Sequence, residues 1–207
     1  MVVRKSILVF LLALFLCPAT GLAGEPGPRA QLEASITAAL QELASPAFAD
    51  PANRNAIFNK IEGIVTQRFD FAAFTSRAVG RNWQSFSPDQ KKRLTDAFAN
   101  LLRETYLNKL TGYNGEKVVY TSEILSTDGK RAEVKTTVII GQRTIPLDYR
   151  LQKTSDWKVY DVIVESLSLT RNFRGQFDSI LQHGDAEALI RAVEQKAEET
   201  RKGNIAG

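Results

Sequence analysis

Two carboxylic acids, Asp161 and Glu165, lie in the segment Tyr160–Phe173 (YDVIVESLSLTRNF), which has the pattern of a strand followed directly by a helix. Two carboxylates about 5–9.5 Å apart can act as acid, base or nucleophile in glycoside hydrolysis. Residues four positions apart in a strand are separated by about 13 Å, at roughly 3.3 Å per residue. This spacing does not favour a catalytic pair. The alternative is that both acids lie on the polar side of a strand whose other side is apolar.

The sequence offers little other catalytic or metal-binding chemistry. His183, the only histidine, lies in the motif LQHGD, which contains neither an evident nucleophile nor an orienting partner. The only cysteine, Cys17, lies in the N-terminal apolar segment, so a zinc site would need mainly carboxylate ligands, which is atypical. The motifs GxSxG, GxGxxG and the P-loop are absent. We therefore expect no enzymatic activity, no metal and no cofactor.

The N-terminal residues have the pattern of a secretory signal peptide. Arg4 and Lys5 precede the apolar run Ile7–Leu16, and small residues at the −3 and −1 positions favour cleavage after Ala23. A run of ten apolar residues is shorter than the roughly 20 needed to span a bilayer. We expect residues 1–23 to be cleaved and the protein to reach the periplasm of a Gram-negative bacterium. An uncleaved anchor and a lipidated N-terminus are the alternatives.

Charge and cysteine content narrow the class of partner. Removing Arg4 and Lys5 with the signal leaves 25 of the 27 basic residues against 23 acidic ones. The remaining chain has no cysteine, so packing rather than disulfide bonds must stabilise it. No dense basic run with interleaved aromatic residues is present, which argues against nucleic acid as a partner.

The hydrophobic pattern predicts one domain of the α+β class. Residues 24–30 are predicted to be a flexible linker, 31–200 a single domain, and 201–207 a flexible tail. Helical periodicity extends from Leu32 to about Gly112, and from Lys117 the period changes to two. Four antiparallel strands are expected at residues 117–125, 131–140, 143–153 and 157–166, followed by helices. Helices, then a meander, then helices indicate an α+β fold with one sheet.

Short sequence signals predict the first residues of two helices and the last residue of one. Asp70 is an expected N-cap of a helix that ends at Gly80. Ser87, followed by proline at the first helical position, forms an expected capping box with Gln90.

The two-residue turn Gly141-Gln142 predicts the register of the central hairpin. The resulting pairs are Ile140–Arg143, Val138–Ile145 and Val134–Tyr149. Matching apolar residues across the next hairpin gives Ile145–Val164, Leu147–Val162 and Tyr149–Tyr160. One face of the sheet is then apolar, with Val134, Val138, Ile145, Leu147, Tyr149, Leu151, Tyr160, Val162 and Val164. The opposite face would hold a surface ion-pair ladder of Lys135, Asp148 and Asp161, with Arg150 opposite Glu133. Trp157, Val159 and Ile163 would lie on the same face.

Apolar and aromatic residues also recur on the helices on both sides of the sheet in sequence. They are Phe71, Phe74 and Val79, then Leu101 and Tyr106, then Phe173 and Phe177. Such residues can form an ordinary core, or they can line a cavity for an apolar ligand. Periodicity shows which side of a helix faces inward, but it does not distinguish a filled core from a lined pocket. Both interpretations stay open.

Four motifs together resemble the toluene-tolerance/MlaC family. They are a phenylalanine-rich helix ending in Gly80-Arg81-x-Trp83, the helix start SPDQ with its F-x-x-L-L-x-x-T-Y core, the passage Trp157–Leu169, and N-x-R-x-Q-F over Asn172–Phe177. The resemblance extends from Leu32 to Ala197. Members of this family are periplasmic phospholipid-binding components of the Mla lipid-asymmetry transport system.

This resemblance implies a twisted sheet and surrounding helices that enclose a hydrophobic cavity. The acyl chains would lie inside and the phosphate near the mouth. The implied function is a soluble carrier of phospholipid between an outer-membrane lipoprotein–porin complex and an inner-membrane ABC transporter with MCE-domain subunits. The expected lipid-binding residues are Phe71, Phe74, Val79, Leu101, Tyr106, Val134, Val138, Ile145, Leu147, Tyr149, Val162, Val164, Phe173 and Phe177. A carrier of a sterol- or hopanoid-like lipid, an enzyme using Asp161, Glu165 or His183, and a periplasmic adaptor are the alternatives.

Overall fold

The computed structural model describes residues 25–206, apart from the side chains of residues 107, 108 and 204–206. The expected signal peptide, residues 1–23, lies outside this part of the chain. The described chain begins with helices, continues as an antiparallel sheet and ends with two helices, so the α+β class is confirmed. The sheet has five strands rather than the four expected, because a strand of two residues follows the fourth.

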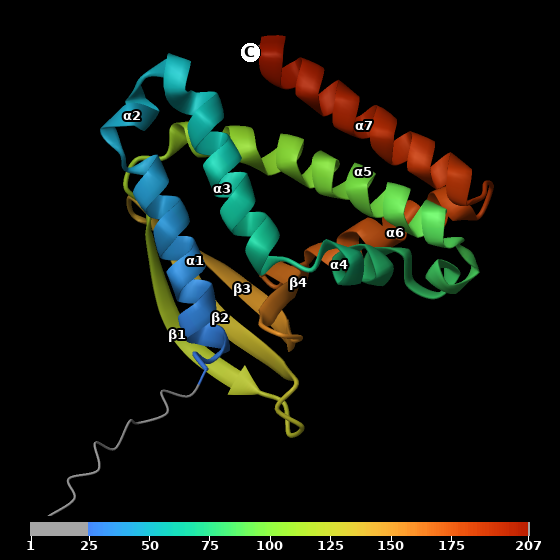
Figure 1. Cartoon of the computed structure of the whole chain (residues 1–207), viewed down its shortest axis with the longest axis horizontal. Coiled ribbons are helices and arrows are strands. Elements are labelled where there is room, and N and C mark those ends of the chain that lie inside the picture. The colour runs from blue at the N-terminus through green and yellow to red at the C-terminus, as the bar shows by residue number, and fades with distance from the viewer. Residues whose placement is uncertain (1–24, 207) are drawn as a thin grey trace, which may run out of the picture.

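The elements follow one another in the predicted order (Figure 1). The N-terminal helices are α1 (Pro28–Leu43), α2 (Pro46–Ala49), η1 (Pro51–Asn53), α3 (Arg54–Arg68), α4 (Phe71–Val79), η2 (Gly80–Ser85), α5 (Pro88–Tyr106) and η3 (Leu107–Gly112). The strands are β1 (Lys117–Leu125), β2 (Arg131–Ile140), β3 (Arg143–Lys153), β4 (Trp157–Val164) and β5 (Leu167–Ser168), and the last helices are α6 (Leu169–Leu181) and α7 (Ala186–Ala206). Helix α1 thus begins inside the expected linker, and α7 extends into the expected tail.

The predicted helix ends form through the expected side chains. Asp70 accepts a hydrogen bond from the backbone N–H of Ala73 at 2.8 Å and so caps α4. Ser87 and Gln90 form the reciprocal capping box of α5, with N···O distances of 3.0 and 3.2 Å. Gly80 follows α4 at a φ of 68°, a backbone conformation that residues with a Cβ rarely adopt.

The register of the central hairpin is confirmed. In the β2–β3 pair, Ile140 faces Arg143, Val138 faces Ile145 and Val134 faces Tyr149. The turn between these strands places Gly141 at a φ of 58°, which a two-residue hairpin turn requires. A short turn of fixed geometry therefore determined this register from the sequence alone.

The predicted register of the β3–β4 hairpin is wrong by two residues. Leu147 faces Val164 and Tyr149 faces Val162, rather than Val162 and Tyr160. The strands are joined by the three residues 154–156, and a bulge follows, since Asp161 faces Arg150 whereas Val159 faces Leu151. Matching apolar residues cannot distinguish registers that differ by two, because both place the same residues on the same face.

The bulge reverses the expected orientation of three residues of β4. Tyr160 has no partner in the ladder, so the residues before it change faces. Trp157 and Val159, predicted for the back of the sheet, pack with Leu151 and Val162 in the core. Tyr160, predicted for the apolar face, lies on the other side, where the guanidinium of Arg77 is 3.9 Å from its ring centroid.

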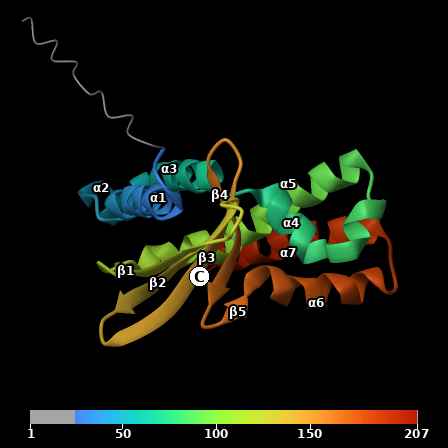
Figure 2. The same cartoon turned by 90° about the horizontal axis from the view of Figure 1, so that it is seen from below.

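The helices form two groups around the sheet (Figures 1 and 2). Helices α1 and α3 pack together and lie over one face of the sheet, where α1 contacts β2 and β4. Helices α4, α6 and α7 group at the other end of the molecule, and α5 runs from this group back toward β1. The backbone N–H of Asp70 donates to the carbonyl of Val159 at 2.9 Å, which joins the start of α4 to β4.

Three apolar cores stabilise this arrangement. The first lies among α4, α5, α6 and α7 around Phe98, the second between α1 and the sheet, and the third among α1, α2 and α3. Among the described residues, none of the helices combines the length and the apolar content that a membrane span requires.

Candidate ligand-binding face of the sheet

The sheet face toward α1 is fully covered along part of its length. Val134 and Leu151 have no exposed surface, and Val162 is 8% exposed. Leu32 of α1 packs against them, and Ile36, one helical turn further on, packs at the edge of the same core. This part of the face is therefore a closed protein core.

The same face is half-open toward the β2–β3 turn. Leu147 and Val164 are only half-buried, at the edge of the core. Val138 and Ile145, which face each other across β2 and β3, are also half-buried and lie outside the three cores of the described residues. Apolar side chains left partly in water on a concave or covered surface are typical of a ligand site. This half-open part of the face is the best candidate for contact with an acyl chain.

Most of the expected helical residues lie in the helical core instead. Phe74, Val79, Leu101 and Phe177 are each at most 6% exposed, and half-buried Phe173 packs against them. The rings of Phe74, Phe173 and Phe177 contact Phe98, whose centroid is 4.7 Å from that of Phe173 and 5.0 Å from that of Phe177. For these positions the structure shows a packed core, and their contact with lipid stays a prediction.

The structure therefore divides the expected lipid-binding residues into three sets. Those on the sheet face are Val134, Val138, Ile145, Leu147, Tyr149, Val162 and Val164, those in the helical core are Phe74, Val79, Leu101, Phe173 and Phe177, and Phe71 and Tyr106 lie elsewhere. Phe71 stacks on Phe69 with ring centroids 5.6 Å apart, and Phe69 packs against the sheet core. Tyr106, at the end of α5, is 41% exposed.

The contribution of β1 to this face was not predicted from the sequence. Val118 faces Val138, and Tyr120 faces Thr136, so both side chains extend the apolar face to a third strand. The alternating pattern of Lys117–Leu125 contained this signal. The turn at Asp128-Gly129 was identified, but a bulge after Tyr120 shifts the ladder and breaks a simple extension of the register.

Two tyrosine hydroxyls lie on this face. Burial, with a smaller contribution from the charge of Glu33, raises the pKa of Tyr120 to about 12. Burial also raises the pKa of Tyr149, which packs in the same core. The guanidinium of Arg29, at the start of α1, lies 5.5 Å from the centroid of the Tyr120 ring. Both hydroxyls are therefore protonated at neutral pH, and each carries a hydrogen that it is able to donate.

The two acids of the strand-to-helix passage do not form a pair. Asp161 is 2% exposed and accepts hydrogen bonds from the hydroxyl of Ser168 at 2.8 Å and the backbone N–H of Thr170 at 3.2 Å. Arg150, directly opposite in the ladder, donates to it at 3.5 Å. Glu165 is exposed in the β4–β5 turn at a φ of 49°. Asp161 therefore holds the start of α6 against the sheet.

This placement corrects the expected ion-pair ladder. Arg150, rather than Lys135 or Asp148, is the charged partner of Asp161. The predicted placement of Arg150 opposite Glu133 is confirmed, and Arg150 donates to the Glu133 carboxylate at 3.0 Å. The two-residue change of register brings Arg150 opposite Asp161 and moves Asp148 away.

We expect Asp161→Ala to lower the free energy of unfolding by about 2–3 kcal/mol, because the α6 start and Arg150 both lose an anionic acceptor. A urea titration measures this loss. Glu165→Ala is the matched control, and its exposed side chain predicts a change within about 0.5 kcal/mol. Equal, small losses in the two variants would contradict the capping role of Asp161.

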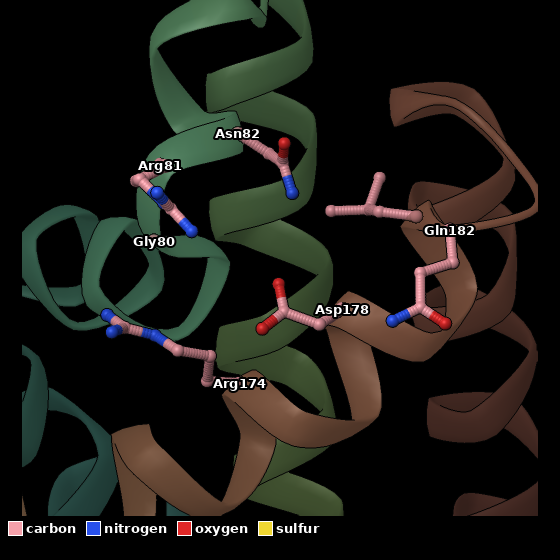
Figure 3. Close-up of a pocket in the computed structure, with 7 residues that line it drawn as sticks. Gly80, Arg81, Asn82, Arg174, Asp178 and Gln182 are labelled. Carbon is pink, nitrogen blue, oxygen red and sulfur yellow. The ribbon is translucent and has the colours of Figure 1, made fainter.

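A separate hollow of about 530 Å³ lies between η2 and α6 (Figure 3). Its lining residues are Gly80, Arg81, Asn82, Arg174, Asp178, Leu181 and Gln182. Figure 3 shows Arg81 and Asn82 on one wall and Asp178 and Gln182 on the facing wall. This lining is polar and is unsuited to acyl chains. His183, next to it in sequence, is exposed.

Contacts between Gly80 and Arg174 join two of the motifs described above, Gly80-Arg81-x-Trp83 and Asn172–Phe177. Arg174 donates from Nε to the carbonyl oxygen of Arg77 at 3.0 Å, and its Nη2 donates to the same oxygen. A Cβ at Gly80 would lie 3.1 Å from that Nε. The absence of a side chain at Gly80 therefore lets α6 close the end of α4.

Gly80→Ala should destabilise the protein by about 1–3 kcal/mol, because alanine is strained at this positive φ and crowds Arg174. Thermal unfolding followed by circular dichroism measures the effect. Gly175→Ala, in the middle of α6 with open space around the new methyl group, should instead stabilise by about 0.5–1 kcal/mol. A Gly80→Ala protein as stable as its parent would mean that this corner has a different backbone conformation.

Comparison with known proteins identifies the family. The family model for MlaC protein matches residues 33–195. The intermembrane phospholipid transport system binding protein MlaC of Haemophilus influenzae is 25% identical, over 93% of this chain and 92% of its own length. Toluene tolerance protein ttg2D of Pseudomonas putida is also 25% identical, over 99% of this chain and 94% of its own length.

A solved structure supports the same assignment. The phospholipid-binding protein from Ralstonia solanacearum, determined in complex with a phospholipid, matches with a TM-score of 0.69 and 27% identity. The match covers 81% of this chain and 97% of that protein. The recognised motifs and the α+β fold therefore have one explanation: the chain belongs to the MlaC family.

Proposed function

We propose that this protein is a periplasmic carrier that binds phospholipid and transfers it between the outer and inner membranes, maintaining outer-membrane lipid asymmetry. The observation that carries the proposal is the half-open apolar face formed by Val138, Ile145, Leu147 and Val164. The relatives named above support it, since two are described by phospholipid binding or transport.

The energetics of acyl chains fit such a face. Withdrawing each CH₂ group from water stabilises the complex by about 0.8 kcal/mol. A carrier therefore needs extended apolar surface more than it needs charged groups. In this arrangement the acyl chains cover Val138 and Ile145, and the polar end of the lipid lies toward solvent.

The partners follow from the same proposal. A carrier must receive and release its cargo at membrane complexes, and the name of the Haemophilus relative places that protein in an intermembrane transport system. We assign the corresponding partners here as an inner-membrane ABC transporter with MCE-domain subunits and an outer-membrane lipoprotein–porin complex.

Native mass spectrometry tests the binding step. The purified protein should carry phospholipid, and after delipidation it should take up phospholipid from added vesicles of phosphatidylethanolamine and phosphatidylglycerol. The headgroup of the bound lipid also separates a phospholipid from a sterol- or hopanoid-like cargo. A protein that copurifies without lipid and takes up none would exclude the proposal.

A further inference from the structure

Three hydroxyl groups lie within the otherwise apolar sheet face. Tyr120 of β1 faces Thr136 of β2, and Tyr149 of β3 faces Val134, the neighbour of Thr136 on the same side of β2. The other members of the sheet core are apolar and include Leu147, Val164 and Trp157. A buried apolar face gains nothing from polar atoms unless each finds a partner.

Two of these residues contrast in how their hydroxyls are satisfied. Thr136 is 2% exposed, and its hydroxyl donates to the carbonyl oxygen of Leu147. The hydroxyl oxygen of Tyr120 is buried and has no hydrogen-bond partner. An unpaired buried hydroxyl costs about 1–3 kcal/mol. Phenylalanine at this position would avoid that cost. The Tyr120 hydroxyl therefore has no stabilising role in the fold, and a role in ligand binding would explain its presence.

The surroundings of Tyr120 indicate which chemical group of a ligand could accept a hydrogen bond from its hydroxyl. An acyl chain has no acceptor, and a phosphate would need a cation beside it in this apolar setting. The nearby cation, Arg29, is 46% exposed in its side chain and lies 3.6 Å from Glu33, so it belongs to the solvent side of the face. An ester carbonyl is a neutral acceptor at the top of each acyl chain of a diacyl phospholipid.

We infer that the Tyr120 hydroxyl donates a hydrogen bond to an acyl-ester carbonyl of the bound phospholipid, and that the protein therefore prefers ester-linked to ether-linked lipids. This inference rests on the proposed function. The hydroxyl is enclosed while the residue as a whole is half-buried. The bond therefore forms when the entering chain displaces the aliphatic neighbours and the ring tilts toward it.

The test compares two short-chain phosphatidylcholines of equal chain length, one a diester and one a diether, below their critical micelle concentrations. Each is titrated into delipidated protein in competition with a fluorescent phospholipid. The wild type should bind the diester about three- to tenfold more tightly, the range of one neutral hydrogen bond. Tyr120→Phe should bind both lipids equally and should be at least as heat-stable as the wild type without lipid.

Tyr160→Phe is the matched control, because Tyr160 lies on the other side of the sheet against Arg77. It should keep the ester preference of the wild type. Equal affinity of the wild type for both lipids would overturn the inference without any variant. An unchanged preference in Tyr120→Phe, or a marked loss of its stability without lipid, would also overturn it. Binding of neither lipid by the wild type would instead contradict the proposed function.

Discussion

Ile145→Glu is expected to weaken phospholipid binding by at least about 100-fold, while the protein remains folded. The reason is that an ionised carboxylate placed against acyl chains loses its hydration without gaining a partner, which costs several kcal/mol. Ile145 is half-buried and lies outside the three cores, so the free energy of unfolding should change by less than about 1 kcal/mol. Competition against a fluorescent phospholipid measures the affinity, and a urea titration measures the stability.

Thr144→Glu is the control for this charge. Thr144 is the preceding residue of β3, is exposed, and points to the opposite face of the sheet. It adds the same charge to the same strand without touching the apolar face, so binding should change by less than about threefold. Equal losses in both variants would indicate a general electrostatic effect. Unchanged binding in Ile145→Glu would show that this part of the face does not contact lipid.

The difference between confirmed and incorrect predictions lies in the range of the interactions involved. The capping box of Ser87 and Gln90 and the register set by Gly141 depend on residues within a few positions of each other. Their geometry is therefore present in the local sequence. Such signals determined one of the two hairpin registers that were predicted from the sequence.

The β3–β4 register and the burial of Asp161 depend on distant parts of the chain. Apolar alternation left two registers open, and the bulge at Tyr160 selects the one that brings Arg150 opposite Asp161. The chain then turns at Glu165 and Ser166, and Ser168 and Thr170 cover the carboxylate. No spacing within the strand reveals that the following helix closes over Asp161.

The candidate site shows the same limit. Alternation in β2 and β3 correctly placed Val134, Val138, Ile145 and Leu147 on one face. Alternation alone could not show that Val134 is fully buried under α1 while Val138 is only half-buried. That difference depends on the position at which Leu32 of α1 packs on the sheet. Periodicity predicts which side faces inward, whereas coverage by another element decides whether that side binds protein or ligand.

A substitution in the aromatic cluster of the helical core tests whether these residues stabilise the fold or contact lipid. Phe177 is 3% exposed and its ring centroid lies 5.0 Å from that of Phe98 and 5.9 Å from that of Phe173. Phe177→Ala should therefore lower the free energy of unfolding by about 3–5 kcal/mol, through lost burial and the cavity left behind. Thermal and urea unfolding of the delipidated protein measure this change. Lipid affinity, measured at low temperature where the variant is folded, should change by less than about threefold, because Phe177 packs in the helical core and is not part of the sheet core.

Phe71→Ala should instead have a small effect on stability and a larger effect on lipid affinity. Phe71 is half-buried and stacks on Phe69, which packs at the edge of the sheet core. Its loss should cost about 1–2 kcal/mol of stability, because the ring is partly exposed and lies outside the fully buried cores. It should weaken lipid binding several-fold if the acyl chains extend from Val164 toward this edge. A Phe177→Ala protein of normal stability but poor binding would instead mean that the helical cluster opens to lipid. The cavity would then extend from the sheet face into the core around Phe98.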